Sequence, residues 1–227
     1  MLCQTLNILP GVTAVIGSGG KTTLLCALAQ ELSQAHTVVL CTTTKIYPPK
    51  GIPTLLDPDE AAVIHALKKA PLVCLGSPAM NGKLGSCGIS FARLKKLAEY
   101  VLVEADGSKR LPLKAHEAHE PVIPPESNRV IQVVGLSGVG RTVKQAAHRP
   151  ERYAALADAS EDSVVTPEIA ARVITRENLA DCVVVNQAES RAAEAMALIS
   201  ALQVPGWYGS VRGGLLIKGE NENACCD

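Results

Sequence analysis

A glycine-rich turn between an apolar run and an amphipathic stretch constrains the fold of this 227-residue chain more than any other feature. The apolar run at residues 12–16 predicts a buried strand, and the stretch that begins at Lys21 predicts a helix. The turn between them contains Gly17, Gly19 and Gly20. A strand that passes through such a turn into a helix is typical of α/β proteins, so we expect that fold class.

The remainder of the chain repeats this alternation of short apolar runs and longer amphipathic stretches. The pattern predicts a mainly parallel sheet flanked by helices, and the glycine-rich turn makes the expected fold P-loop NTPase-like. The expected strands cover residues 12–16, 37–41, 72–75, 100–104, 129–134, 182–186 and 207–210. The expected helices cover residues 21–34, 58–69, 91–98, 167–175 and 190–202, with N-caps at Asp57 and Thr166.

We expect residues 1–218 to form a single nucleotide-binding domain, with residues 137–177 as a candidate helical sub-lobe and residues 219–227 as a disordered tail. Two proline-containing segments, residues 42–54 and 107–128, read as long loops. Loops of this length inside a compact domain are usually functional, so both are candidate parts of a site.

Composition narrows the partners and the location. Lys plus Arg and Asp plus Glu both total 22, so no overall field favours a nucleic acid or an anionic membrane, and neither partner is expected. No apolar run reaches the roughly 18 residues of a membrane helix, and the N-terminus lacks a signal-peptide pattern. We therefore expect a cytoplasmic protein, with most of its eight cysteines reduced in the core.

The glycine-rich turn predicts a phosphate site. Its backbone N–H groups can converge on phosphate oxygens at the start of a helix, where the helix dipole is positive. Lys21 is expected to bridge the β- and γ-phosphates of ATP or GTP, and the Thr22 hydroxyl to coordinate Mg²⁺. The loop is one residue shorter than the usual P-loop and resembles the shortened P-loop of the Mur ligases. The expected nucleotide-binding segment is Gly17-Ser18-Gly19-Gly20-Lys21-Thr22-Thr23.

Two carboxylates follow the apolar run at residues 100–103. Glu104 ends the expected strand and Asp106 comes two positions later, so both can project from one side of the sheet edge. We expect Glu104 to hold Mg²⁺ or its water, and Asp106 to be a second ligand or to orient a water molecule. The alternative is a strand end capped by solvated acids.

Polar residues after two other expected strands extend this candidate site. Thr43 and Lys45 follow the strand at residues 37–41 and are candidate contacts to the γ-phosphate or substrate, as in a switch segment, or ordinary strand-end residues. Asn186 ends the strand at residues 182–186 and is a candidate contact to the nucleotide base. Gln187, Ala188 and Glu189 replace the residues that select guanine in many GTPases, so ATP and GTP both remain open.

Several of these segments together resemble the YqeC family. The resemblance covers roughly residues 8–215, and the segments that carry it are residues 17–23, 42–45, 104–108, 119–124 and 148–151, with Asn186. It implies an accessory protein of selenium-dependent molybdenum hydroxylases, acting in a nucleotide-dependent step that makes or inserts the selenium-containing molybdenum cofactor. The implied partners are the molybdenum cofactor or a selenium donor, and a hydroxylase apoprotein.

The loop after Asp106 supplies candidate substrate residues. Lys109 belongs to a local basic cluster that either contacts substrate or is a solvated edge. His119 and Glu120 are expected either to touch substrate or to form structural hydrogen bonds, and the same alternatives hold for His148 and Arg149. The spacing of the histidines does not match the zinc protease motif.

Three functions are consistent with these predictions. The first is an NTPase or an NTP-dependent enzyme that modifies a cofactor precursor by phosphoryl or acyl activation, with Lys21, Glu104 and Asp106 as catalytic residues. The second is a nucleotide-gated chaperone whose loops switch between states that bind an apoprotein. The third is a nucleotide-binding module without turnover, because no dedicated catalytic base is identifiable.

Overall fold

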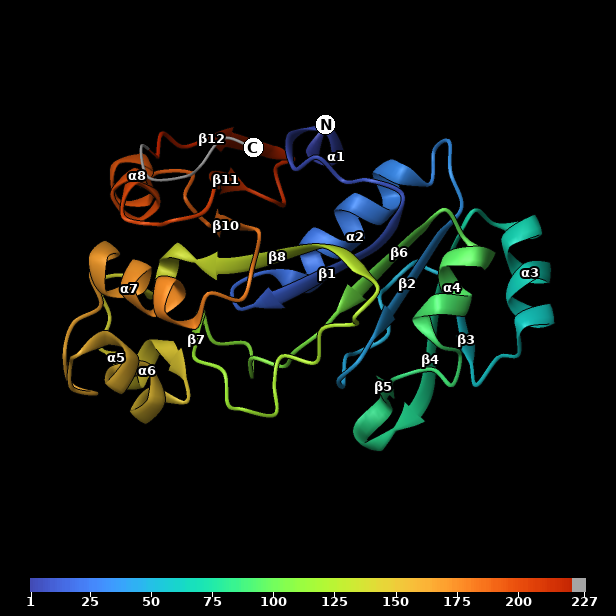
Figure 1. Ribbon diagram of the computed structural model, residues 1–227, viewed down its shortest axis with the longest axis horizontal. Helices are drawn as coiled ribbons and strands as arrows, with labels where there is room; N and C mark the ends of the chain where they lie inside the picture. The colour runs from blue at the N-terminus through green and yellow to red at the C-terminus, as the bar shows by residue number, and fades with distance from the viewer. Residues whose placement is uncertain (222–227) are drawn as a thin grey trace. The chain divides into compact units, whose positions relative to one another are not determined.

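The computed structural model describes residues 1–221 and has the predicted α/β fold, with mostly parallel strands flanked by helices (Figure 1). Contacts divide these residues into two compact units. Unit 1 is Met1–Val15, Thr22–Gly107 and Pro121–Val130, and unit 2 is Ile16–Lys21, Ser108–Glu120 and the residues from Ile131 onward. The prediction of a single domain over residues 1–218 stays a prediction. Most of the expected tail, residues 222–227, lies outside the described residues.

Unit 1 contains five parallel strands in the order β3, β4, β2, β6, β1, and a sixth, β5, pairs antiparallel with β4. In chain order its elements are α1 (Leu2–Thr5), β1 (Gly11–Gly17), α2 (Lys21–Leu32), β2 (Val38–Thr42), β3 (Thr54–Leu56), α3 (Glu60–Lys69), β4 (Leu72–Ala79), η1 (Met80–Gly82), β5 (Lys83–Gly85), α4 (Phe91–Leu97) and β6 (Tyr100–Glu104). The unit boundary falls inside β1 and at the first residue of α2.

One face of the unit 1 sheet packs against α3 and α4, which Figure 1 shows side by side. Alternate residues of β2, such as Val39 and Cys41, share a buried cluster with Val63 of α3 and Leu94 of α4. This alternation follows from the two-residue period of a strand. Burial of both faces explains why β2 and β6 are continuous apolar runs in the sequence.

Unit 2 has a smaller parallel arrangement of β8, β10 and β11, with β12 antiparallel to β11. A separate pair joins β7 to β9. In chain order the elements are β7 (Leu113–Lys114), β8 (Ser127–Gly135), η2 (Leu136–Gly138), α5 (Val143–Ala146), β9 (Ala147–His148), α6 (Pro150–Ala157), α7 (Pro167–Glu177), β10 (Cys182–Asn186), α8 (Ala192–Ser200), β11 (Gly206–Ser210) and β12 (Leu215–Lys218). The first residues of β8, Ser127 to Val130, belong to unit 1.

Helices α5, α6 and α7 fall within the segment expected to be helical, and their buried side chains join one apolar cluster with β10 and α8. The start of α7 is as predicted, because the Thr166 side chain accepts a hydrogen bond from the backbone N–H of Ile169 at 3.3 Å. The predicted start of α3 is wrong. Asp57 lies in the left-handed region, and Asp59 is the N-cap that accepts from the N–H of Ala62 at 2.7 Å.

Candidate functional site

The glycine-rich turn of unit 2 adopts a conformation that only glycine accommodates at its centre. Gly19 and Gly20 have φ values of +81° and +137°. A Cβ atom on Gly19 would lie 2.3 Å from the backbone nitrogen of Gly135, and one on Gly20 would lie 2.3 Å from the side-chain amide of Asn186. Both the backbone conformation and the close approach of neighbouring chain therefore require glycine here.

Hydrogen bonds within unit 2 hold this turn in place. The backbone N–H of Ser18 donates to the carbonyl of Val133 at 2.8 Å, and the Ser18 hydroxyl donates to the carbonyl of Leu111. The Asn186 amide donates to the carbonyl of Gly19 at 2.8 Å, and its oxygen accepts from the backbone N–H of Val211 at 3.0 Å. The turn is thus fixed by contacts on several sides.

Lys21 folds back onto the turn that precedes it. Its ammonium group donates to the carbonyl of Gly17 at 2.8 Å and to the Ser108 hydroxyl at 3.3 Å, and the residue is only 4% exposed. The Lys21 ammonium is thus buried and held against the carbonyl oxygen of the loop. The predicted phosphate ligand is therefore part of the loop.

In unit 1, a hydroxyl and a carboxylate that the sequence assigns to Mg²⁺ meet directly. The Thr22 hydroxyl donates to Oε2 of Glu104 at 2.7 Å. Glu104 is buried at the end of β6, and Asp106 is also buried. The backbone carbonyl of Glu104 accepts from the Thr42 hydroxyl at 2.7 Å and from the backbone N–H of Thr43 at 3.1 Å, so β2 fixes the end of β6.

The donor set of unit 1 fits a magnesium ion that is shared with a ligand. Within residues 1–221, no group of three or more His, Cys, Asp and Glu side chains is arranged to hold a metal by itself. Mg²⁺ in nucleotide enzymes usually takes one or two carboxylates and completes its shell with phosphate oxygens and water. Hard oxygen donors such as Thr22 and Glu104 match that requirement.

Thr43 and Lys45, the predicted site residues that follow β2, differ in their contacts. The Thr43 hydroxyl donates to the backbone carbonyl of Val122 at 2.7 Å, so it ties two segments of unit 1 together. Lys45 is exposed. Their predicted contact with the γ-phosphate or substrate stays a prediction.

Two of the predicted substrate residues of unit 2, Glu120 and Arg149, lie in an ion-pair network. Glu120 pairs with the ammonium of Lys114 at 2.8 Å and with the guanidinium of Arg149. Lys114 lies on β7 beside His148 on β9, and the side chain of Lys114 is fully buried. The structure thus brings Glu120 and Arg149 together, whereas His119 is exposed on the same loop.

Sequence reasoning missed the buried pair of His116 and Glu177. The backbone N–H of His116 donates to Oε1 of Glu177 at 2.6 Å, and its Nδ1 lies 2.8 Å from Oε2. The two side chains are 2% and 4% exposed. Glu177 ends α7, which is 61 residues away in sequence, so no local pattern signalled the pairing. This pair fastens the loop after β7 to the helices of unit 2.

Cysteine thiols in the core of unit 1 are unsuited to nucleophilic chemistry. Burial raises the pKa of Cys41 well above its usual value and also raises the pKa of Cys87. Thiolates, not thiols, are the reactive form. The expectation that these cysteines are reduced core residues agrees with their free, buried state.

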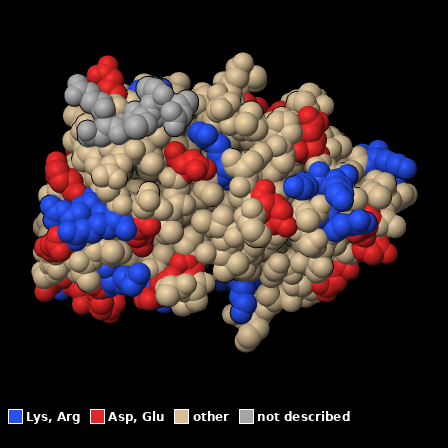
Figure 2. All heavy atoms as spheres, in the orientation of Figure 1, with Lys and Arg blue, Asp and Glu red and all other residues tan. Residues whose placement is uncertain are grey.

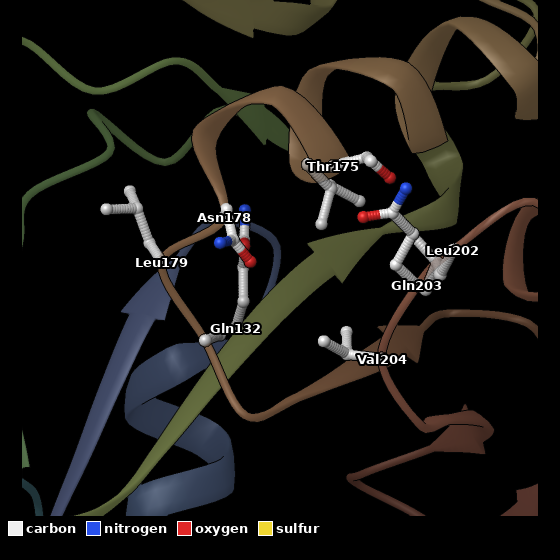
Figure 3. A pocket seen from close by; sticks show the side chains of 9 residues that line it. Gln132, Thr175, Asn178, Leu179, Leu202, Gln203 and Val204 are labelled. Atoms are coloured by element: carbon white, nitrogen blue, oxygen red, sulfur yellow. The ribbon is translucent and has the colours of Figure 1, made fainter. Parts of the chain in front are cut away.

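Unit 2 also encloses two small cavities that share Gln132. The first is seen in Figure 3, where the side chains of Gln132, Asn178, Thr175 and Gln203 surround it. The second is lined in part by Ser18 of the glycine-rich turn. Each has a volume of about 10 Å³, which is room for about one water molecule and not for a nucleotide.

The comparisons with known proteins identify the family of this chain. The family model described as "YqeC protein" matches residues 13–151, more than half of the chain. The chain belongs to the YqeC family. The matched residues include the glycine-rich turn, Glu104, Asp106 and Arg149, and they exclude Asn186.

A relative within the YqeC family comes from Escherichia coli (strain K12) and is named "Uncharacterized protein YqeC". It is 35% identical over 164 residues, which cover 69% of this chain. The chain spans 64% of the length of this relative. These matches establish the family of the chain and leave its activity to be proposed from the site.

Figure 2 shows basic and acidic side chains interspersed on the visible face. Among residues 1–221, every helix is too short or too polar to cross a bilayer.

Proposed function

We propose that this YqeC protein binds a magnesium–nucleotide complex, ATP or GTP, at the glycine-rich turn and activates or hydrolyses it. The observation that carries the proposal is Lys21, a buried lysine that folds back onto a turn whose glycines cannot be replaced without a clash. A turn of this type at a helix start binds phosphate through its N–H groups. The proposal includes the cytoplasm as the place of action.

Residues 21 and 22 join the proposed phosphate site to the proposed magnesium site. Lys21 and Thr22 are consecutive residues at the start of α2, and we propose that both act on the bound nucleotide. In our proposal, Lys21 neutralises charge on the β- and γ-phosphates, and Thr22 with Glu104 holds the metal. Bound Mg²⁺ would polarise the terminal phosphoryl group. Asp106 would orient the attacking water or acceptor, and Asn186 would keep the turn in shape beside the base.

For the cellular role, we propose support of the biosynthesis or insertion of the selenium-containing molybdenum cofactor of hydroxylases. Family membership and the nucleotide site support this role. The cofactor precursor or a selenium donor would then be the acceptor, and Lys109, His119, Glu120, His148 and Arg149 are the candidate residues that contact it. Thr43 and Lys45 are proposed to respond to the γ-phosphate.

A chaperone function is the second candidate, and the two long irregular segments favour it. Residues 43–53 contain no strand or helix, and residues 105–126 contain only the two residues of β7. In this alternative, bound nucleotide would order these segments for a hydroxylase apoprotein, with little turnover by the protein alone.

The decisive experiment is calorimetric titration with ATP and GTP in the presence of Mg²⁺. We expect one nucleotide to bind, and Lys21→Ala to weaken binding at least 100-fold because the buried cation is lost. Lys95→Ala, which removes an exposed lysine of α4, should bind as the unaltered protein does. Thermal melting of both variants checks that each is folded.

Phosphate release on the same samples separates the two functions. Fast release by the protein alone would support the enzyme, whereas slow release that an apo-hydroxylase accelerates would support the chaperone. If neither nucleotide binds, or if Lys21→Ala binds as tightly as the original, the proposed function is wrong.

A further inference from the structure

A tight turn of four residues, Ser108–Leu111, lies against the glycine-rich turn in unit 2. We call it the strap. Its first residue accepts a hydrogen bond from Lys21 at 3.3 Å through the Ser108 hydroxyl, and its last residue accepts one from the Ser18 hydroxyl through the Leu111 carbonyl. The backbone N–H of Leu111 donates to the carbonyl of Ser108 at 3.0 Å and closes the strap. Both ends are therefore fixed to residues of the proposed phosphate site.

The two central residues of the strap are both basic, and both adopt a costly backbone conformation. Lys109 has φ +48° and Arg110 has φ +63°. Positive φ at both central positions is the pattern of a type I′ turn, which strongly favours Asn and Gly. Side-chain-bearing residues in this region are strained and often occur at functional sites.

The fixed ends confine these two cations to the neighbourhood of the turn. Consecutive Cα atoms are about 3.8 Å apart, so Lys109 is one residue from the contact of Ser108 with Lys21, and Arg110 is one residue from the contact of Leu111 with Ser18. Both side chains are exposed, and each carries its charge at the end of a long, flexible stem. The strap thus adds positive charge beside Lys21.

We propose that Arg110 contacts the terminal phosphoryl group of the bound nucleotide and stabilises the transition state of its transfer, with Lys109 in a supporting role. This proposal rests on the proposed function. In the transfer, the bond between the γ-phosphorus and the bridging oxygen breaks, and the electron pair stays on the diphosphate. Water or an acceptor hydroxyl forms the new bond to phosphorus and releases its proton to solvent. Arg110 transfers no proton and neutralises developing negative charge.

Arginine is the better candidate of the two. Its planar guanidinium can donate two parallel hydrogen bonds to phosphate oxygens, whereas an ammonium acts as a point charge. An arginine that a protein supplies to its own nucleotide in this way can raise turnover by roughly 10³-fold or more. Arg110→Lys should therefore recover only part of the function.

The test measures binding of three magnesium complexes by calorimetry: the nucleoside diphosphate, a non-hydrolysable triphosphate analogue, and the diphosphate with aluminium fluoride, which imitates the transferring phosphoryl group. For Arg110→Ala we expect diphosphate affinity within twofold of the original and at least a tenfold loss with aluminium fluoride. Arg141→Ala, which removes another exposed arginine of unit 2, should change none of the three. These measurements need no turnover.

A second variant separates function from a structural role of the strap. Lys109→Asn combined with Arg110→Gly places the preferred residues of the turn type at its centre, so it should raise the melting temperature while it weakens the aluminium fluoride complex. Equal losses for all three complexes, or no loss, would overturn the role of Arg110. If the unaltered protein binds no nucleotide, the proposed function itself fails, and the assignment fails with it.

Discussion

Unit 1 and unit 2 each contain polar groups of the candidate site, yet these groups differ in kind. In unit 1 they are the buried carboxyl groups of Glu104 and Asp106 and the hydroxyl of Thr22. In unit 2 they are backbone amides of a glycine-rich turn, Lys21 and the basic strap. Oxygen ligands bind a hard cation such as Mg²⁺, whereas backbone amides and basic side chains bind phosphate. In the proposed function, the metal ligands belong to unit 1 and the phosphate ligands to unit 2.

The largest effect should come from variants that break this division. In the proposed function Glu104 acts through the metal, so Glu104→Gln should weaken nucleotide binding only when Mg²⁺ is present and should lower turnover about 100-fold. Lys21→Ala should weaken binding with and without Mg²⁺. Calorimetry with Mg²⁺ or with a chelator, followed by phosphate release, distinguishes the two.

Glu99→Gln is the matched control for Glu104, since Glu99 is a half-exposed acid just before β6 that pairs with His36. We expect it to leave nucleotide binding unchanged. Equal weakening by Glu104→Gln with and without Mg²⁺ would contradict the assignment of the metal to unit 1.

The next effect concerns stability, since the two units also differ in how they use ion pairs. Glu177→Ala removes both contacts to His116, and breaking a buried pair of this kind costs about 3–5 kcal/mol of unfolding free energy. In unit 1, Glu60 pairs with Arg93 at the surface, and Glu60→Ala should have a much smaller effect because water screens that pair.

Urea unfolding of the two variants measures this difference directly. A loss for Glu177→Ala no larger than that for Glu60→Ala would mean that the charges of unit 2 do not anchor its loop. The folded fraction at zero urea should be confirmed for both before the midpoints are compared.

The smallest effect is a pH dependence from the cysteines of unit 1. Burial raises the pKa of Cys74 from 9.0 to about 12. The unfolded thiol therefore ionises at lower pH than the folded one, so this contribution to stability is complete below pH 9 and is lost as the pH rises toward 12. In Cys74→Ala the decline in urea midpoint between these pH values should be shallower. If the urea midpoint of Cys74→Ala declines as steeply as that of the unaltered protein, the pH dependence comes from other groups.

The sequence predicted those parts of the fold that depend on local pattern. The apolar runs of β6 and β10 were placed at their observed bounds, Tyr100–Glu104 and Cys182–Asn186, because strands buried on both faces must be apolar throughout. Short elements such as β7 and β9 were missed. Two residues carry too little pattern, and these strands exist only because they pair with each other.

The candidate site follows the same rule. The order of glycines, Lys21 and Thr22 already predicted a phosphate-binding turn, because the conformations that glycine allows and the start of a helix are local properties. The sequence could not show that Thr22 meets Glu104 from 82 residues away, or that Asn186 holds the turn from 167 residues away. It left Glu120 and Arg149 open between substrate contact and structure, and their pairing depends on where the loop and α6 are placed.

By itself, then, the sequence determined the α/β class, the glycine-rich turn and the acidic end of β6, since each depends on residues that are neighbours in the chain. Only the tertiary structure decided the division into two units, the strap beside the turn and the buried pair of His116 and Glu177. These features join residues far apart in the chain. Their free energy comes from burial and from the satisfaction of polar groups, which exist only after the strands and helices have packed.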